Sequence, residues 1–191
     1  MSSLNTLPPA LHAALAALPA GALVALDGRC AAGKTTLAAA ICTAFPGTVT
    51  VHMDDFYLPA ARRTPQRMAQ PGGNIHWERF LEEVLLPMGR GQAFVYTPFS
   101  CQSQALQPGT VLTPGRLNII EGSYSCLPAL RPHYALRVFL DVERAEQLRR
   151  IEARGGAEAL AAFQKQWIPR EEAYFAACGV QACCQMTLRM A

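Results

Sequence analysis

Residues 22 to 36 read A-L-V-A-L-D-G-R-C-A-A-G-K-T-T, an apolar run that leads into a glycine-rich turn and then into a stretch suited to a helix. Within it, Gly28 is followed by Gly33, Lys34 and Thr35 at the spacing of a phosphate-binding loop, in the strand-to-helix context that such a loop requires. The glycines let successive backbone N–H groups turn inward around phosphates, and the helix dipole adds attraction. The alternative is an ordinary strand-to-helix turn. We therefore expect an α/β unit built around a phosphate site.

The positions of this loop have expected roles in binding a nucleotide and its metal ion. The side chain of Lys34 is expected to reach the β and γ phosphates, and the hydroxyl of Thr35 to bind a Mg²⁺ that bridges them. The predicted nucleotide-binding residues are Gly28, Arg29, Cys30, Ala31, Ala32, Gly33, Lys34, Thr35 and Thr36.

Length and composition favour a single globular domain over residues 1–191. Hydrophobic residues make up 51% and charged residues 16% of the chain, which argues against disorder. A net charge of +3, without a basic stretch interleaved with aromatics, gives no indication of nucleic-acid binding. The most apolar stretch, Ala10 to Leu26, is broken by Pro19 and Gly21, so we predict no membrane span. No basic residue precedes Arg29, so we predict no secretory signal.

The cysteines indicate a reducing compartment. There are seven of them, an odd number without a C-x-x-C spacing, which argues against a disulfide framework and a zinc site. The cytoplasm is therefore the predicted location. Cys178, Cys183 and Cys184 could bind a metal, but buried small apolar side chains near a chain terminus are the favoured interpretation.

The spacing of apolar residues predicts alternating helices and strands. Leucines recur at helical spacing from Leu4 to Leu18, which indicates an amphipathic helix in residues 1–19. Such alternation implies a three-layer α/β/α sandwich with a mostly parallel sheet of five strands. The strands are expected at Ala22 to Asp27, Thr48 to Met53, Leu117 to Glu121, Leu136 to Asp141 and Met186 to Met190.

The pattern changes in residues 59–115, which we interpret as an insertion over the carboxyl edge of the sheet. It starts with a loop rich in Pro, Gly and Arg, continues with a helix at Trp77 to Leu86, and ends in extended pieces at Ala93 to Phe99 and Thr110 to Thr113. Ligands of open α/β sheets bind at that edge, so the insertion is expected to shape the pocket of a second substrate.

Carboxylates follow two of the predicted strands. The segment H-M-D-D-F-Y-L places Asp54 and Asp55 beside the phosphate loop, where one of them could accept a hydroxyl proton during phosphoryl transfer. Asp54 is the candidate base, whereas a turn cap or a pair with arginine is the alternative, and the favoured one for Asp55. Glu121 ends the third strand and is the candidate ligand of Mg²⁺ or its water shell, the alternative being a solvent-facing position.

A predicted helix carries arginines toward the same edge. Arg150 and Arg154 are four residues apart on one face, and Gly155 and Gly156 end the helix. A lid at residues 149–166 could deliver these charges to the phosphates and exclude water. The alternative is an exposed helix with a Glu146–Arg150 ion pair.

Taken in order, these motifs resemble the uridine kinase and phosphoribulokinase branch of P-loop kinases. The resemblance spans about residues 20 to 175 and extends to bacterial uridine kinase-like proteins, which share G-R-C-A-x-G-K-T-T, D-D-F-Y, G-G-N before an E-R-F helix, E-G-S-Y-S and W-I-P-x-E-E-x-Y-F. It implies a P-loop NTPase fold with an acceptor-side insertion and an arginine-bearing lid. By this resemblance Asp54 is the general base. Lys34, Thr35 and Glu121 serve ATP and Mg²⁺, and Arg150 and Arg154 act from the lid.

The acceptor side departs from authentic uridine kinases. His76 stands in N-I-H-W where the family has the carboxylate of N-F-D-H, and Cys101 stands where it has a base-recognising histidine. Loss of a polar group from a pocket can change substrate choice by orders of magnitude. The alternative for the aromatic candidates is a place in the core. The candidate acceptor-binding residues are Asp54, Tyr57, His76, Trp77, Tyr96 and Phe99.

Two hypotheses about activity follow. The first is an ATP- and Mg²⁺-dependent kinase that phosphorylates a hydroxyl of a small molecule such as uridine, cytidine, pantothenate or a phosphosugar. Arg62, Arg63 and Arg67 would suit a phosphosugar or form a solvated loop. The second is a nucleotide switch or partner-regulated NTPase without a small-molecule acceptor. Asp54→Asn separates them, because only the kinase needs a base for an organic hydroxyl. The sequence makes no prediction of oligomeric state.

Overall fold

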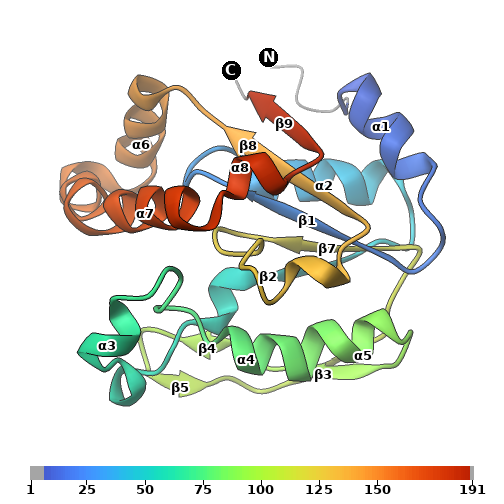
Figure 1. The fold of residues 1–191 in the computed structure, drawn as a ribbon, viewed down its shortest axis with the longest axis horizontal. Coiled ribbons are helices and arrows are strands. Elements are labelled where there is room, and N and C mark those ends of the chain that lie inside the picture. The colour runs from blue at the N-terminus through green and yellow to red at the C-terminus, as the bar shows by residue number, and fades with distance from the viewer. Residues whose placement is uncertain (1–6, 190–191) are drawn as a thin grey trace.

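Five parallel strands form the central sheet of residues 7–189, the part of the chain that the computed structural model describes (Figure 1). Their spatial order is β2, β7, β1, β8, β9, so the strand that leads into the phosphate loop lies in the middle. The predicted sheet is confirmed, and all four of its strand pairs are parallel. Leu4 and Met190, which fall in predicted terminal elements, lie outside the described residues. The strands are β1 (Ala22–Gly28), β2 (Val49–His52), β7 (Leu117–Glu121), β8 (Leu136–Asp141) and β9 (Met186–Arg189).

Helices cover both faces of this sheet and give the predicted three layers (Figure 1). On one face lie α1 (Pro9–Ala16) and α2 (Lys34–Ala44), whose apolar side chains form a cluster with the strands. On the other face lie the helix of the insertion, α7 (Ile168–Cys178) and α8 (Val180–Cys183). Among residues 7–189, none of the helices combines the length and the apolar character that a membrane crossing requires.

The central strand β1 is buried at every position because both of its faces are covered. Leu23 and Ala25 belong to one apolar cluster, whereas Val24 and Leu26 belong to the cluster on the opposite face. This double burial explains why the sequence of β1 is apolar without alternation. The strand delivers its last residue, Gly28, to the carboxyl edge of the sheet.

The insertion contains one long helix and two small antiparallel ribbons. The helix has α-helical ends and a π-helical middle. Pro87, in the α-helical end that follows the π-helical turn, lacks the N–H that a regular hydrogen-bond ladder needs. The helix begins at Trp77, as predicted, and runs on to Gly89. The ribbons pair β3 with β6 and β4 with β5. The elements are η1 (Met53–Phe56), before the insertion, then η2 (Ala60–Arg62), α3 (Pro65–Met68), α4 (Trp77–Phe80), η3 (Leu81–Leu85), α5 (Leu86–Gly89), β3 (Phe94–Tyr96), β4 (Phe99–Ser100), β5 (Ala105–Leu106) and β6 (Thr110–Leu112).

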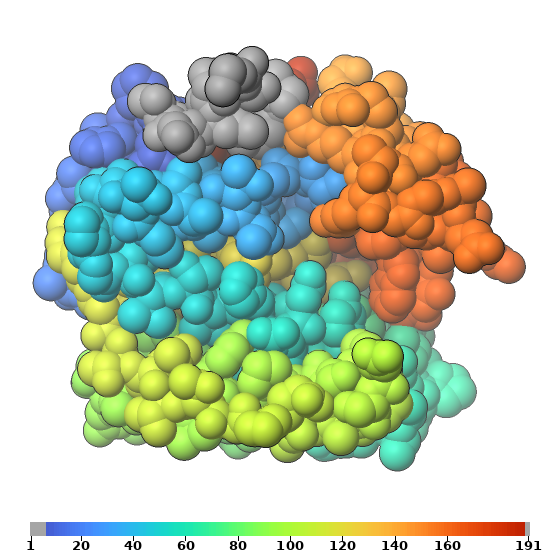
Figure 2. Space-filling view, turned by 180° about the vertical axis from the view of Figure 1, so that it is seen from behind, coloured from blue at the N-terminus to red at the C-terminus, as the bar shows by residue number. Residues whose placement is uncertain are grey.

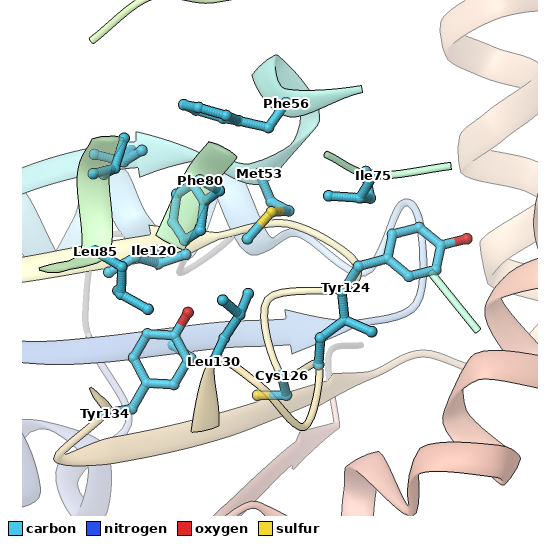
Figure 3. Close-up of a cluster of buried hydrophobic side chains, with 14 of the residues drawn as sticks. Met53, Phe56, Ile75, Phe80, Leu85, Ile120, Tyr124, Cys126, Leu130 and Tyr134 are labelled. Carbon is cyan, nitrogen blue, oxygen red and sulfur yellow. The ribbon is translucent and has the colours of Figure 1, made fainter. Parts of the chain in front are cut away.

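A buried apolar cluster fixes the insertion against the sheet (Figure 3). Met53 and Phe56 of the short helix η1 enter this cluster together with Phe80 of α4 and Ile120 of β7. The rings of Phe56 and Phe80 meet edge to face, with centroids 5.0 Å apart. The segment that carries Asp54 is therefore fixed by buried side chains on both sides of this residue.

The arginine-bearing helix is broken where two glycines were predicted to end it. In α6 (Arg144–Ala162), Gly156 has φ 74° and ψ −176°, a conformation that only glycine adopts readily. The chain then resumes a helical course through the π-helical turn η5 (Phe163–Trp167) into α7. The predicted break is present, but a second helical segment follows it. A short turn, η4 (Arg131–His133), precedes β8.

Candidate active site

The phosphate loop joins β1 to α2 in the predicted order. Its backbone enters the left-handed region at Gly28, Ala31 and Gly33, with φ of 134°, 59° and 90°. A Cβ atom at Gly28 would lie 2.1 Å from the carbonyl oxygen of Leu140, so only glycine fits there. Such a backbone turns successive N–H groups to one side, which is the arrangement that anions bind.

Most predicted loop residues line one large cavity of about 1080 Å³. Three do not line it: Gly28, the buried Ala32, and Arg29, whose guanidinium pairs with Asp141 and Glu172 behind the loop. The remaining members are Cys30, Ala31, Gly33, Lys34, Thr35 and Thr36.

The ammonium of Lys34 is folded back over the loop. Its Nζ donates to the carbonyl oxygens of Gly28 at 2.8 Å and Arg29 at 2.9 Å, and to Ser123 Oγ at 3.3 Å. The side chain is buried at the floor of the cavity. A positive charge therefore stands at the loop.

A hydroxyl and a carboxylate meet where a metal ion is expected. Thr35 Oγ1 donates to Glu121 Oε1 at 3.0 Å, and His52 Nδ1 lies 2.6 Å from the same oxygen. The hydrogen bond to Glu121 raises the pKa of His52. Among residues 7–189 no three His, Cys, Asp or Glu side chains are arranged to enclose a metal ion. Thr35 and Glu121 instead fit Mg²⁺, which usually keeps waters and takes substrate phosphates as further ligands.

Asp54 and Asp55 have different surroundings. Asp54 faces the cavity, where protein walls reduce its hydration and raise the pKa of its carboxyl group, an effect that the charge of Lys34 opposes. Asp55 accepts a hydrogen bond from the hydroxyl of Tyr96. The two adjacent carboxylates thus divide into one that is open to a ligand and one that anchors the insertion.

The arginine helix contacts the loop directly. Arg150 donates from Nε to Glu146 at 2.7 Å and from Nη1 to the carbonyl oxygen of Ala31 at 3.2 Å. Both the predicted ion pair and the predicted approach to the loop are present. Arg154 lies one turn further along the cavity wall and is exposed. In Figure 2 this orange segment stands beside the blue residues of the loop and α2.

The predicted acceptor residues divide between the cavity and the core. Tyr57 lines the cavity with Asp54, and its ring lies 6.2 Å from that of Trp167. The hydroxyl of Tyr96 accepts from the backbone N–H of His52 at 3.2 Å and so supports a strand end. Phe99 is buried, and Trp77 packs against the core.

His76 also lies outside the cavity lining. Its Nε2 is 2.7 Å from the guanidinium of Arg62. Partial burial of the imidazole lowers its pKa, and the charge of Arg62 lowers it further. Other side chains line the cavity in place of His76, Tyr96, Phe99 and Trp77. One is Cys101, which the resemblance places at the position of a base-recognising histidine; Tyr124, Phe163 and Trp167 were not predicted.

Two buried residues of the site were not predicted, Ser123 and Glu171. Glu171 accepts from the backbone N–H of Cys30 at 3.0 Å and from Ser123 Oγ at 2.6 Å. A carboxylate of α7 therefore accepts a hydrogen bond from a backbone amide of the phosphate loop. The amide of Cys30 thus points at a negatively charged group, which is the kind of partner that a phosphate would be. Both residues stand in motifs of the resemblance, E-G-S-Y-S and W-I-P-x-E-E-x-Y-F, which was the available signal.

Among known proteins, this chain is similar only to solved structures. No protein-family model matches the chain, and no curated protein does. A protein from Silicibacter sp. TM1040 proposed to be a fructose transport system kinase matches with a TM-score of 0.73 and 22% identity, over 98% of this chain and 100% of its own. A protein from Bacillus stearothermophilus proposed to be a uridine kinase matches with a TM-score of 0.71 and 15% identity, over 93% and 95%. The D-glycerate 3-kinase of Cryptococcus neoformans matches with a TM-score of 0.57 and 14% identity, over 81% and 78%.

The sheet order, the loop and these matches define an α/β/α sandwich of the P-loop class. The fold is shared with solved structures that include a protein proposed to be a uridine kinase and a D-glycerate 3-kinase, which agrees with the fold that the sequence motifs predicted.

Proposed function

We propose that this protein transfers the γ-phosphate of ATP to a hydroxyl group of a neutral small molecule. The observation that carries the proposal is that Asp54 faces the same cavity as Lys34, Thr35 and Arg154. A carboxylate, a phosphate loop and cationic side chains around one cavity are the parts that in-line phosphoryl transfer needs. The solved structures of this fold, which include a D-glycerate 3-kinase, support the proposal of a kinase.

Each residue has a proposed task. Asp54 would orient the acceptor hydroxyl and take its proton. Lys34 would leave its loop carbonyls for the phosphates, while Arg150 and Arg154 would counter charge that develops during transfer. Thr35 and Glu121 would hold Mg²⁺, which supplies charge neutralisation on the β and γ phosphates when bound.

A neutral acceptor is proposed because aromatic side chains line the cavity near Asp54. Tyr57, Tyr124 and Trp167 offer apolar ring faces to the cavity. The three arginines considered for a phosphosugar are engaged elsewhere. Arg62 contacts His76, Arg63 donates to the carbonyl oxygen of Leu58, and Arg67 forms a bidentate pair with Glu78.

The proposal is tested by measuring ADP release with ATP and Mg²⁺ against a panel of acceptors. The panel contains uridine, cytidine and fructose as neutral acceptors, and pantothenate, D-glycerate and a sugar phosphate as charged ones. We expect a neutral acceptor to stimulate ADP release, and Asp54→Asn to lower that rate by about 10²–10⁴-fold, the usual contribution of a positioned base.

Asp55→Asn is the matched control, since an amide oxygen at that position still accepts from Tyr96. It should retain most of the acceptor-dependent rate. If no acceptor changes the rate of ADP release, in the wild type and in both variants, the result would contradict the proposed kinase activity and favour the nucleotide-switch alternative. Stimulation only by charged acceptors would contradict the neutral class.

A further inference from the structure

The large cavity continues past the phosphate loop on the side away from Asp54. Its lining there includes Leu7 and Pro8, from the segment that leads into α1. In both overall views α2 lies between α1 above it and the segment after β2, which carries Asp54, below it (Figure 1 and Figure 2). The residues that line this part of the cavity, called the far wall below, are Leu7, Pro8, Leu37, Ala40, Glu146, Arg149 and Arg189.

The start of α1 is fixed in place against α2. Leu7 is buried in the same apolar cluster as Leu37. The ring of His12 lies 5.0 Å from that of Phe45, which follows the last residue of α2. The carbonyl oxygen of Pro8 accepts from the backbone N–H of His12 at 2.9 Å and so closes the first turn of α1. The two residues before α1 therefore form a constant part of the cavity surface.

The far wall combines an apolar surface with a guanidinium group. Leu7, Pro8 and Ala40 supply the apolar surface. Arg149 donates from Nε and from Nη2 to the two carboxylate oxygens of Glu146, each at 2.6 Å. Such a bidentate pair uses the edge of the guanidinium and leaves its flat faces for stacking on an aromatic ring. An apolar surface with a guanidinium nearby suits a planar, uncharged aromatic ring such as a nucleobase.

The phosphate loop lies between the two ends of the cavity and gives a bound nucleotide its direction. In the proposed reaction the γ-phosphate faces Asp54, because this carboxylate takes the proton of the acceptor hydroxyl. The α-phosphate and the nucleoside then extend away from Asp54, past Thr36 and toward the far wall.

We propose that Leu7 and Pro8 form part of the binding site for the base of the donor nucleotide. One face of the base packs on the apolar surface that these residues share with Ala40, with the guanidinium of Arg149 at the same end of the cavity. The inference rests on the proposed function, which sets the direction of the nucleotide. It adds to the nucleotide site a segment that precedes the phosphate loop and belongs to a different helix.

The proposal is tested by titrating the full-length protein with two ligands, MgATP and magnesium tripolyphosphate, which has the phosphates but no base. Pro8→Ser removes an apolar ring from the far wall, and serine is a favoured residue at the N-cap of a helix such as α1. We expect this variant to bind MgATP about threefold more weakly and tripolyphosphate as the wild type does. Calorimetry measures both affinities.

Pro9→Ser is the matched control. Pro9 is the next residue, is exposed and does not line the cavity. Both affinities should stay unchanged in this variant. Equal weakening of MgATP binding by the two substitutions, or equal weakening of both ligands in Pro8→Ser, would overturn the proposed contact with the base. Unchanged MgATP binding in Pro8→Ser would do the same.

NMR spectroscopy tests the contact directly. The protein is labelled with carbon-13 at its leucine methyl groups and saturated with MgATP. The signals of Leu7 are assigned by their loss in Leu7→Ile, which keeps an apolar side chain of similar volume. We expect nuclear Overhauser effects between an adenine ring proton and the methyl groups of Leu7, and none to Leu15, which is buried in α1. Their absence at Leu7 would overturn the proposal.

The same measurements separate this proposal from the proposed function. If MgATP binds and gives these effects at Leu7 but no acceptor stimulates ADP release, the base site stands and the kinase activity is contradicted. If an acceptor is phosphorylated but the adenine protons contact leucines other than Leu7, the kinase stands and the base site is overturned. A wild-type protein that binds neither ligand would overturn both.

Discussion

Glu171 places a carboxylate on the phosphate loop, where the backbone N–H of Cys30 and the hydroxyl of Ser123 both donate to it. A nucleotide phosphate would meet this negative charge and compete for the same amide. Glu171→Gln keeps the size of the side chain and removes the charge. We expect it to lower the dissociation constant of MgATP about tenfold, which corresponds to roughly 1.4 kcal/mol. Isothermal titration calorimetry measures the change.

Glu172→Gln is the matched control for this variant. Glu172 is the next residue along α7 but pairs with Arg29 behind the loop, outside the large cavity. Its loss should change the affinity for MgATP by much less. Weaker binding in Glu171→Gln would show that Glu171 supports the loop rather than competing with phosphate.

Asp54 gives the proposed reaction a dependence on pH. Reduced hydration, opposed by Lys34 and reinforced by the charges of Glu121, Glu171 and Asp55, raises the pKa of Asp54 above its ordinary 3.8. A general base works only when ionised, so kcat should fall as pH is lowered through this raised pKa. Glu171→Gln removes a neighbouring negative charge and should move the acid limb to lower pH. A shift to higher pH would contradict the assignment.

His52 is another titrating group, next to Thr35 and Glu121, the pair proposed to hold Mg²⁺, and its pKa is also raised. His52→Gln separates the two contributions. The acid limb of kcat should remain in this variant if it belongs to Asp54. Its disappearance would assign the limb to the His52–Glu121 pair.

At the scale of elements, Gly156 is the residue at which the arginine-bearing helix α6 is broken. Its φ of 74° and ψ of −176° are accessible to glycine, and a Cβ atom there would meet nothing within 4 Å. Gly156→Ala therefore changes backbone strain without a clash, and we expect a loss of about 1–3 kcal/mol in the free energy of unfolding. Urea denaturation measures it. Gly89→Ala is the control, because Gly89 has a helical conformation and open space, so alanine should be neutral or mildly stabilising. Equal effects of both substitutions would contradict backbone strain at position 156.

Elements and side chains differ in how far sequence predicts them. The strands were predicted within about one residue because a covered parallel strand must be apolar on both faces, as β1 is. His76, Tyr96 and Phe99 were predicted to face an acceptor, and none lines the cavity. The direction of a side chain in a short loop depends on partners distant in sequence, such as the Tyr96 hydroxyl, which reaches His52 across 44 positions.

At the scale of the whole molecule, the site is assembled from the loop after β1, the ends of β2 and β7, and the helices α6 and α7. The backbone course of the contiguous loop was predictable because one local shape fixes it, although three of its nine predicted residues do not line the cavity. The bond between Glu171 and Cys30 spans 141 positions, so no local pattern predicts it. The fold class follows from local motifs, whereas the walls of the cavity follow from packing.

Because one cavity is lined by all of these elements, a bound nucleotide should stabilise the entire fold. At a concentration one hundred times its dissociation constant, a ligand adds about 2.7 kcal/mol to the free energy of unfolding. For a chain of 191 residues this predicts a rise of about 5–10 °C in Tm with MgATP, measured by differential scanning calorimetry. Lys34→Ala should remove most of the rise. Lys165→Ala, which changes the other lysine of the chain on an exposed helical turn, should keep it. An unchanged Tm in the wild type at millimolar MgATP would contradict the assignment of this cavity to a nucleotide, whatever the acceptor.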